Sequence, residues 1–182
     1  MPITIRDATI ADLPGILAIY NDVVRTSTAV YSEQEATLED RRAWFDQRIG
    51  QGYPALAAED SSDGSVLGFA TFGDFRPSPG YRHTVEHSVH VRADARGRGL
   101  GARLVEPLFG RAVSLGKHVM IAGIDAANPA SLRLHEKLGF EHAGTLREVG
   151  TKFGRWLDLV FMQRFLDGRH ARAAGHAAGA GR

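Results

Sequence analysis

Two kinds of hydrophobic spacing alternate along the first third of the chain. Apolar and polar residues alternate over residues 3–7, which predicts a first strand. Over residues 13–25 the apolar positions recur at helical spacing, so we expect a helix with one buried face. A second helix is predicted from about residue 37 to residue 49, where Glu39 and Asp40 favour the positive end of a helix and an apolar stripe follows. Residues 26–32, small and polar, predict a loop between these helices that covers a pocket.

Strand signals dominate the middle of the chain. Residues 55–59 and 66–72 predict two strands, and the Asp-, Ser- and Gly-rich residues 60–64 between them predict a hairpin loop. Residues 73–80 contain Gly and Pro and break regular structure. A long alternating strand is then expected over residues 81–91.

The remaining pattern mixes helices and strands. Helical spacing returns over residues 101–116 and 128–138, each segment ended by a glycine. Strands are predicted at residues 118–124, 140–149 and 155–165. This order of about seven strands and four helices does not repeat as a doubly wound fold would. It predicts an α+β class, with one mixed sheet flanked by helices.

Length and composition favour one folded domain. A chain of 182 residues with 43% hydrophobic and 24% charged residues lies in the globular range. We assign the domain to residues 1–167. Residues 168–182 are rich in Gly, Ala, Arg and His, and we expect them to form a disordered tail because they offer little apolar surface to bury.

Charge and cysteine content exclude several classes of function. A formal net charge of +1 gives no overall field for nucleic-acid or membrane-surface binding, so neither partner is expected. The sequence has no run of about 18 apolar residues and does not begin like a secretory signal, which predicts a cytoplasmic protein. The absence of cysteine removes thiolate nucleophiles and covalent transfer through sulfur.

A glycine-rich turn follows the strand predicted at residues 81–91. Its glycines are Gly97, Gly99 and Gly101, and Arg96 and Arg98 lie between and beside them. Glycine lets a ligand approach the backbone, and the start of the next helix offers unpaired N–H groups. Arginine adds donors that suit phosphate oxygens. The turn therefore predicts a site for a cofactor that carries a pyrophosphate.

The spacing of the glycines excludes other phosphate loops. A Walker loop and a dinucleotide fingerprint need spacings that this turn lacks. Residues 96–101 instead read Arg-x-x-Gly-x-Gly, with Leu100 between the last two glycines, and this motif resembles the acetyl-CoA loop of the GNAT superfamily of N-acetyltransferases. The segment from Asn128-Pro129-Ala130-Ser131 to Phe140 resembles the second hallmark of that superfamily.

Three stretches resemble one branch of the superfamily, the phosphinothricin and methionine sulfoximine acetyltransferases: residues 84–91, 134–140 and 149–158. The resemblance implies a mostly antiparallel mixed sheet and a homodimer. It also implies direct transfer of acetyl from acetyl-CoA to the α-amine of a small amino-acid analogue.

Two residues are candidates for proton transfer, because an amine must lose a proton before it attacks a thioester. Glu86 is the first choice of base, and the alternative is that it only pairs with an arginine on the sheet surface. His135 stands where many members of the superfamily carry a tyrosine thought to protonate the leaving thiolate. It could be that acid, a second base, an orienting group, or a hydrogen-bonded histidine beside the pocket.

The cofactor is expected along the strand and the glycine turn. The backbone of Ser88, Val89 and His90 should pair with pantetheine as a further strand would. Asn128 resembles the side chain that binds the pantetheine arm, and it also suits a helix start, so we assign it both roles. The full expected set is Ser88, Val89, His90, Val91, Arg96, Gly97, Arg98, Gly99, Leu100, Gly101 and Asn128.

The acceptor site is expected beside the same strand. Arg76 is the preferred cation for the acceptor's carboxylate, and Arg82 is the alternative. Lys152, Phe153 and Trp156 could line the pocket or serve as core or dimer contacts. The expected acceptor-binding residues are Tyr31, Phe75, Arg76, Pro77, Val85, Glu86 and His87.

No metal site is expected. In the predicted strand His83 and His87 share one face and His90 lies on the other, so the three cannot converge. Two further functions remain open besides the small-molecule acetyltransferase. One is acetylation of a protein or peptide amine, and the other is a non-catalytic acyl-CoA sensor.

Overall fold

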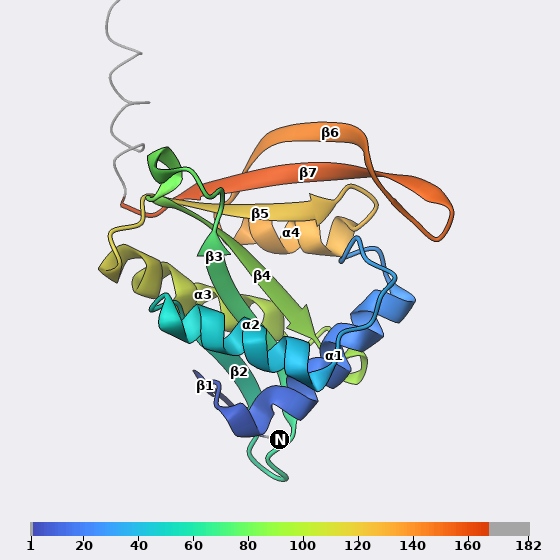
Figure 1. The fold of residues 1–182 in the computed structure, drawn as a ribbon, viewed down its shortest axis with the longest axis vertical. Helices are drawn as coiled ribbons and strands as arrows, with labels where there is room; N and C mark the ends of the chain where they lie inside the picture. Colours follow the sequence, from blue (N-terminus) through green and yellow to red (C-terminus); the bar gives the residue numbers. More distant parts are fainter. Residues whose placement is uncertain (1, 168–182) are drawn as a thin grey trace, which may run out of the picture.

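The fold contains the predicted seven strands and four α-helices. A computed structural model describes residues 2–167, and the tail predicted at 168–182 lies outside the described residues. In chain order (Figure 1) the elements are β1 (Ile3–Asp7), α1 (Leu13–Thr26), α2 (Leu38–Gly50), β2 (Ala55–Asp60), β3 (Val66–Asp74), β4 (Thr84–Val91), α3 (Leu100–Ser114), β5 (Val119–Asp125), α4 (Pro129–Lys137), β6 (Glu141–Lys152) and β7 (Arg155–Phe165).

The strands form one mixed sheet, which confirms the predicted class. Its order is β1-β2-β3-β4-β5-β7-β6, and β4–β5 is its parallel pair while the other neighbours are antiparallel. This parallel pair is short, because Thr84–Glu86 is matched with Val119–Ile121 and the pairing then stops. Figure 1 shows β4 and β5 diverging beyond that point, so the sheet opens near its middle.

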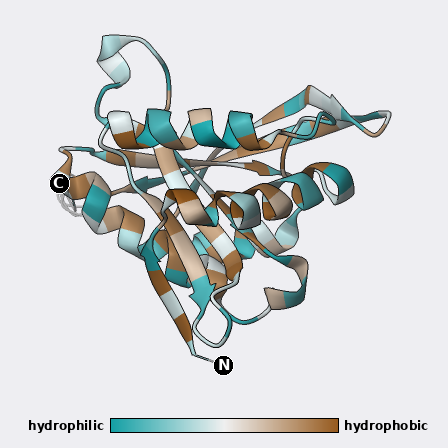
Figure 2. Cartoon of the chain, turned by 60° about the horizontal axis from the view of Figure 1, so that its bottom comes forward, coloured by the Kyte–Doolittle hydropathy of each residue, from teal (hydrophilic) through white to brown (hydrophobic). Residues whose placement is uncertain are grey.

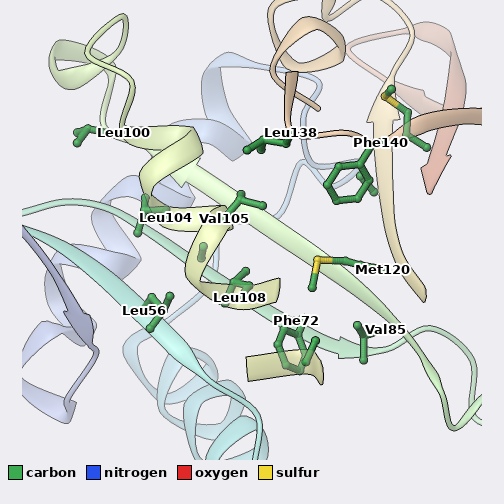
Figure 3. Close-up of a cluster of buried hydrophobic side chains, with 14 of the residues drawn as sticks. Leu56, Phe72, Val85, Leu100, Leu104, Val105, Leu108, Met120, Leu138 and Phe140 are labelled. Atoms are coloured by element: carbon green, nitrogen blue, oxygen red, sulfur yellow. The ribbon is translucent and has the colours of Figure 1, made fainter. Parts of the chain in front are cut away.

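Helices cover both faces of the sheet. Alternation along β3 sends Phe69 toward α1 and α2, where it joins the apolar cluster of Ile16 and Phe45. Ala70 and Phe72 point to the other face of the sheet, where they join the larger cluster around Leu104 of α3. Figure 3 shows this larger cluster extending to Met120 and Phe140, and Figure 2 shows hydrophilic and hydrophobic positions alternating along the helices. Burial on both faces therefore fixes the register of the strands.

Two strand boundaries differ from the prediction. The strand expected from residue 81 begins at Thr84, because Pro79–Tyr81 forms a 3-10 turn in which Tyr81 N–H donates to Ser78 O. The strand expected to end at residue 149 continues to Lys152. It then turns into β7 through Phe153 and Gly154, which both have positive φ, the geometry of a tight two-residue hairpin.

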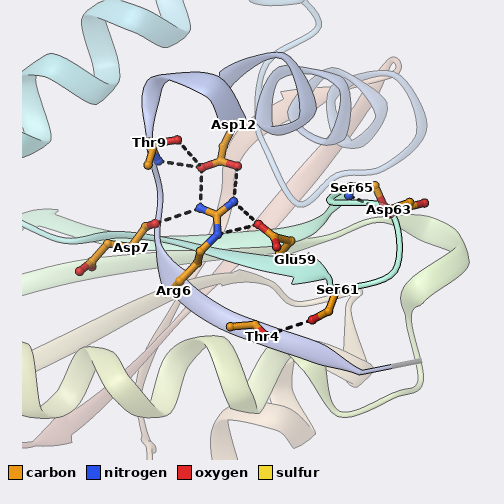
Figure 4. Close-up of polar contacts among 9 residues, drawn as sticks. All are labelled: Thr4, Arg6, Asp7, Thr9, Asp12, Glu59, Ser61, Asp63 and Ser65. Carbon is orange, nitrogen blue, oxygen red and sulfur yellow. Dashed lines mark hydrogen bonds and ion pairs between the residues drawn. The ribbon is translucent and has the colours of Figure 1, made fainter.

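A charged cluster fixes the start of the chain to the sheet (Figure 4). The Arg6 guanidinium donates to both oxygens of Asp12 at 2.8 Å and also pairs with Glu59 of β2. Asp12 accepts from the Thr9 N–H at 2.7 Å, which closes a capping box at the entrance to α1. The hydrogen bond from Arg6 holds the pKa of Asp12 below its usual value. Within residues 2–167 we find no helix with the length and apolar character needed to span a membrane.

The Asp12 cluster predicts a pH-dependent loss of stability. Because the pKa of folded Asp12 is lowered, its ion pair stabilises the protein above the unfolded pKa of about 3.9 and is lost as pH falls through the lower folded value. Asp12→Asn should therefore lower the free energy of unfolding by about 1–3 kcal/mol at pH 7 and by less below about pH 4. Urea unfolding at several pH values measures this. Asp63→Asn, at an exposed carboxylate, is the control, and an equal effect of Asp12→Asn at all pH values would contradict the prediction.

Candidate active site

A pocket lies where β4 and β5 diverge, and we call it the central pocket. It has a volume of about 390 Å³. Glu86, His87 and Ser88 of β4 line it, as do residues of β5, α4 and the loop between α1 and α2. The divergence places both faces of β4 within reach of this one space, because no strand fills the gap.

A second hollow runs along the glycine turn, and we call it the glycine-loop groove. Its volume is about 480 Å³, and it shares Val89, His90, Asn128 and Ser131 with the central pocket, so the two hollows meet at β4. Most of the residues expected to hold the cofactor line this groove: Val89, His90, Val91, Arg96, Gly97, Gly99, Leu100, Gly101 and Asn128. Ser88 lines the central pocket instead, and Arg98 is exposed outside both sets.

Beyond Glu86, backbone N–H and C=O groups on one side of β4 point into the gap, where no residue of β5 is paired with them. Arg92 N–H donates to Leu67 O on the β3 side. Successive residues of a strand turn their backbone groups to opposite sides, so those of Val89 and Val91 point toward the gap. The Arg96 Nε donates to Val91 O at 3.2 Å. Val89 therefore offers the N–H and C=O best placed to pair with an extended ligand.

The three glycines of the turn are required for two different physical reasons. Gly97 and Gly99 have φ values of 75° and 74°, a conformation that side chains disfavour. Gly101 lies within α3, where a Cβ would come within 2.9 Å of the Leu134 side chain of α4. The helix begins at Leu100 with no side-chain cap, so the N–H groups of its first turn are available to an anion.

Glu86 lies on the face of the sheet that carries α1 and α2. Its carboxylate lies over Gly123 of β5, where a Cβ would be 2.9 Å from Glu86 Oε1. Burial raises the pKa of this half-buried carboxyl, and the charge of Arg76 partly opposes the shift. A carboxyl with a raised pKa can accept a proton near neutral pH more readily than an ordinary one.

His87 points to the opposite face of β4 and meets His135 of α4. Their Nε2 atoms are 3.1 Å apart, and His135 Nδ1 is 2.7 Å from Ser131 O. A carbonyl can only accept, so His135 carries its proton on Nδ1, and its Nε2 accepts from His87 Nε2–H. Burial lowers the pKa of His87 to about 3 and also lowers that of His135, so both rings are neutral. The buried Nδ1 of His87 has no partner among the described residues.

The loop between α1 and α2, residues 27–33, is tied across the central pocket. Lys152, 1% exposed, donates through Nζ to Ser27 O at 2.7 Å and to Val30 O at 2.8 Å. Thr28 donates to the Asp125 carboxylate of β5, and Tyr31 OH donates to Asp158 O. Burial raises the pKa of Tyr31 to about 12, so its hydroxyl stays a donor. These contacts hold the loop as a cover over the pocket.

Several residues expected at the acceptor site lie elsewhere. Val85 is fully buried in the core beside Phe72, so it does not face the pocket (Figure 3). Arg76 is exposed, and its guanidinium lies 4.2 Å from the Phe75 ring while Nη1 donates to Phe75 O. Other expected residues that do not line the central pocket are Tyr31, Phe75, Pro77 and Arg82.

Lys152, Phe153 and Trp156, which the sequence analysis considered as pocket-lining residues, also lie outside the pocket lining. Phe153 and Trp156 are 46% and 67% exposed on the β6–β7 arm, and Lys152 holds the covering loop. None of the three lines the central pocket.

The sequence analysis did not identify Arg48 of α2, which lines the central pocket. A signal was present, since Arg48 follows Trp44 by four residues and Phe45 by three, and so lies on the apolar stripe of the helix. A charge on a buried stripe calls for a partner or a ligand. Asn128 has its expected capping role, because its side chain accepts from Ser131 N–H at 3.1 Å.

No group of three or more metal-ligating side chains gathers anywhere in residues 2–167. His83 lies before β4 and its ring contacts Gly116 O at 2.8 Å. His90 packs with Phe69 on the face opposite His87, at a ring distance of 5.2 Å. The three histidines therefore have separate environments.

Comparisons with known proteins agree with this geometry. Residues 16–140 match the model of the acetyltransferase (GNAT) family. The chain is 57% identical to an L-methionine sulfoximine/L-methionine sulfone acetyltransferase of Pseudomonas aeruginosa, over 92% of this chain and 96% of that protein. It is 49% identical to the L-amino acid N-acyltransferase MnaT of Escherichia coli, over 91% and 95%.

A solved structure has the same fold. It is a phosphinothricin acetyltransferase of Sinorhizobium meliloti in complex with acetyl-CoA, with a TM-score of 0.89, 42% identity, and coverage of 94% of this chain and 92% of that one. The chain belongs to the acetyltransferase (GNAT) family, and it is an N-acetyltransferase.

The buried lysine gives a prediction about the covering loop. Lys152→Met keeps an apolar stem but leaves the carbonyls of Ser27 and Val30 without their donor. Amide hydrogen exchange in residues 27–33 should become about tenfold faster or more, because the loop opens more often. Lys137→Met, at an exposed lysine of α4, should leave the exchange unchanged. Unchanged protection in Lys152→Met would show that the loop does not depend on this contact.

Proposed function

We propose that this protein transfers acetyl from acetyl-CoA to the α-amine of a small amino-acid analogue of the methionine sulfoximine, methionine sulfone or phosphinothricin type. The observation that carries the proposal is the junction of the two hollows at β4, with a half-buried carboxyl beside it. Relatives named for these acceptors are 57% and 42% identical to this chain. The covered central pocket, about 390 Å³, suits an acceptor of that size.

The residues of the glycine-loop groove fit acetyl-CoA. Gly97 and Gly99 expose backbone N–H groups at the uncapped start of α3, which suits a pyrophosphate. Val89 offers strand-like pairing to the pantetheine amides, and Asn128 can donate from Nδ2 because its Oδ1 caps α4. When bound there, acetyl-CoA supplies a thioester carbonyl to the junction of the two hollows.

Glu86 is the base in this proposal. Its carboxylate takes a proton from the acceptor's ammonium group, directly or through a water, and leaves an amine able to form the new N–C bond. Burial favours proton uptake, because it raises the pKa of this carboxyl. As the N–C bond forms, the C–S bond of the thioester breaks and CoA leaves as a thiolate. The conjugate thiol has a pKa near 8.5, so release of the thiolate needs less help from an acid than release of an alkoxide would, and it then takes up a proton.

His135 fits an orienting role best among the roles that the sequence leaves open. Its one proton, on Nδ1, is donated to Ser131 O, and its Nε2 accepts from His87, so neither nitrogen is free to protonate a leaving group. With its pKa lowered by burial, it is uncharged at neutral pH. We propose that the histidine pair fixes β4 against α4 and so keeps the junction of the hollows open.

The other two functions predict different behaviour. A protein acetyltransferase needs an open groove for a chain, whereas residues 27–33 cover the central pocket. A non-catalytic sensor would not need Glu86. Homodimerisation, which the resemblance implies, stays a prediction that sedimentation of the purified protein would test.

Acceptor specificity tests the proposal. Steady-state rates with acetyl-CoA should be highest for L-methionine sulfoximine, L-methionine sulfone or L-phosphinothricin, and low for a peptide with a free N-terminal amine. The thiol released in each reaction gives the rate. Faster turnover of the peptide, together with no turnover of the three amino-acid analogues, would overturn the substrate class.

Replacement of Glu86 tests the base. Glu86→Gln should lower kcat by about 10²- to 10⁴-fold and leave CoA binding unchanged. In the parent protein, kcat should fall at acid pH as Glu86 takes up its proton, with an apparent pKa above the usual value of about 4.3. This acid limb should be absent from the variant. Glu136→Gln, at an exposed glutamate of α4, is the control, and a kcat within threefold in Glu86→Gln would assign the base elsewhere.

A further inference from the structure

Arg48 lines the central pocket and has few partners of its own, so its guanidinium is available to bind a ligand. It lies in the last turn of α2 and is half-buried. The Nε atom is buried without a hydrogen-bond partner among the described residues, and Nη1 has a long contact of 3.4 Å to Gln51. Burial lowers the pKa of Arg48, and the charge of Asp74 opposes this shift only in part.

The nearest carboxylate is occupied by other residues. Asp74 accepts from Tyr53 OH and lies 3.8 Å from the ammonium group of Lys117. Of the side chains that line the central pocket in the described part of the chain, Arg48 is the one with a permanent positive charge. An anionic group that enters this pocket therefore has one strong partner.

The sheet makes room for this guanidinium. A Cβ on Gly73 of β3 would lie 2.7 Å from the Cζ, Nη1 and Nη2 atoms of Arg48, so the guanidinium occupies the space of the missing side chain. Gly73 is directly opposite Glu86 in the β3–β4 register, and the Glu86 carboxylate lies over Gly123 of β5. The cation and the carboxylate therefore lie on one face of the sheet, on either side of β4.

The arrangement of the two groups suits an α-amino acid. An α-amino acid carries an ammonium group and a carboxylate on the same Cα, so an acceptor that lies across β4 can present its amine to Glu86 and its carboxylate to Arg48. Ser88, which lies on the same face of β4 as Glu86, also lines this pocket.

We propose that Arg48 binds the α-carboxylate of the acceptor and thereby selects free amino acids over amides and peptides. This inference rests on the proposed function and names the residue that recognises the acceptor's carboxylate. It replaces Arg76, whose guanidinium lies on its own Phe75 ring outside the pocket. A planar fork of donors suits a carboxylate better than a single ammonium group does.

Equilibrium binding tests the proposal without turnover. L-methionine sulfone, whose only anion is its carboxylate, and its carboxamide are titrated calorimetrically into the protein saturated with CoA. The parent protein should bind the acid about 30-fold more tightly than the amide, or better, and Arg48→Gln should lose this preference while its affinity for the amide changes less than twofold. Arg48→Lys should recover part of the preference.

Two further variants separate recognition from folding. Arg42→Gln removes an exposed guanidinium from the same helix and should behave as the parent protein does. Gly73→Ala keeps Arg48 but displaces its guanidinium, and should weaken binding of the acid about tenfold. Melting temperature and CoA affinity report on the fold of each variant.

The outcomes are distinct. Equal affinity of the parent protein for acid and amide, binding of neither compound, or an acid preference retained in Arg48→Gln would overturn the role of Arg48. So would an equal loss of affinity for both compounds, which indicates a structural role. Absence of acetyl transfer to any amino-acid analogue in the parent protein would instead overturn the proposed function, and the carboxylate preference would still be measured.

Discussion

The early end of the β4–β5 pairing is the constraint on which the site depends. Parallel pairing stops after Glu86 and Ile121, yet β3 stays paired with β4 as far as Val91. Beyond Glu86, the backbone groups on one side of β4 are thus left facing a gap, which is stable only if a ligand, a side chain or solvent pairs with them. The His87–His135 contact lies at the edge of this gap, and Lys152 holds residues of the covering loop above it. The pocket therefore exists because the sheet is left incomplete there.

Glycines inside strands create the space that the site uses. Gly73, Gly123 and Gly150 lie under Arg48, Glu86 and Tyr31 respectively, and each would clash with that side chain if it carried a Cβ. Glycine within a strand weakens the strand, so its presence points to close approach by another group. One face of the sheet is therefore shaped to receive long polar side chains from β4, from α2 and from the covering loop.

Local patterns were sufficient to predict much of this protein. Hydrophobic periodicity located every strand and helix, with errors only at boundaries such as Thr84, where the proline-rich turn before β4 outweighs the alternation. The spacing of Gly97 and Gly99 identified the loop, since two positive φ angles in a short turn require glycine. Glu86 is the candidate base because it lies on the strand that enters this loop, beside which the resemblance places the acetyl group, and its role stays a prediction.

The contacts across the sheet could not be predicted in this way. In sequence, Lys152 is open to a role as a pocket, core or dimer residue, Arg48 carries only the weak signal of a charge on an apolar stripe, and Arg76 is preferred because the family resemblance places it beside the acceptor site. Their roles come from long-range contacts: Lys152 meets a loop more than a hundred residues away, and Arg48 crosses β3 at Gly73. The sequence by itself determined the elements and the glycine turn, since these follow from short-range periodicity and backbone geometry, and its motifs indicated the class of protein through their resemblance to a known superfamily. Only the tertiary structure decided which charges face the pocket, because burial and pairing are properties of the packed fold.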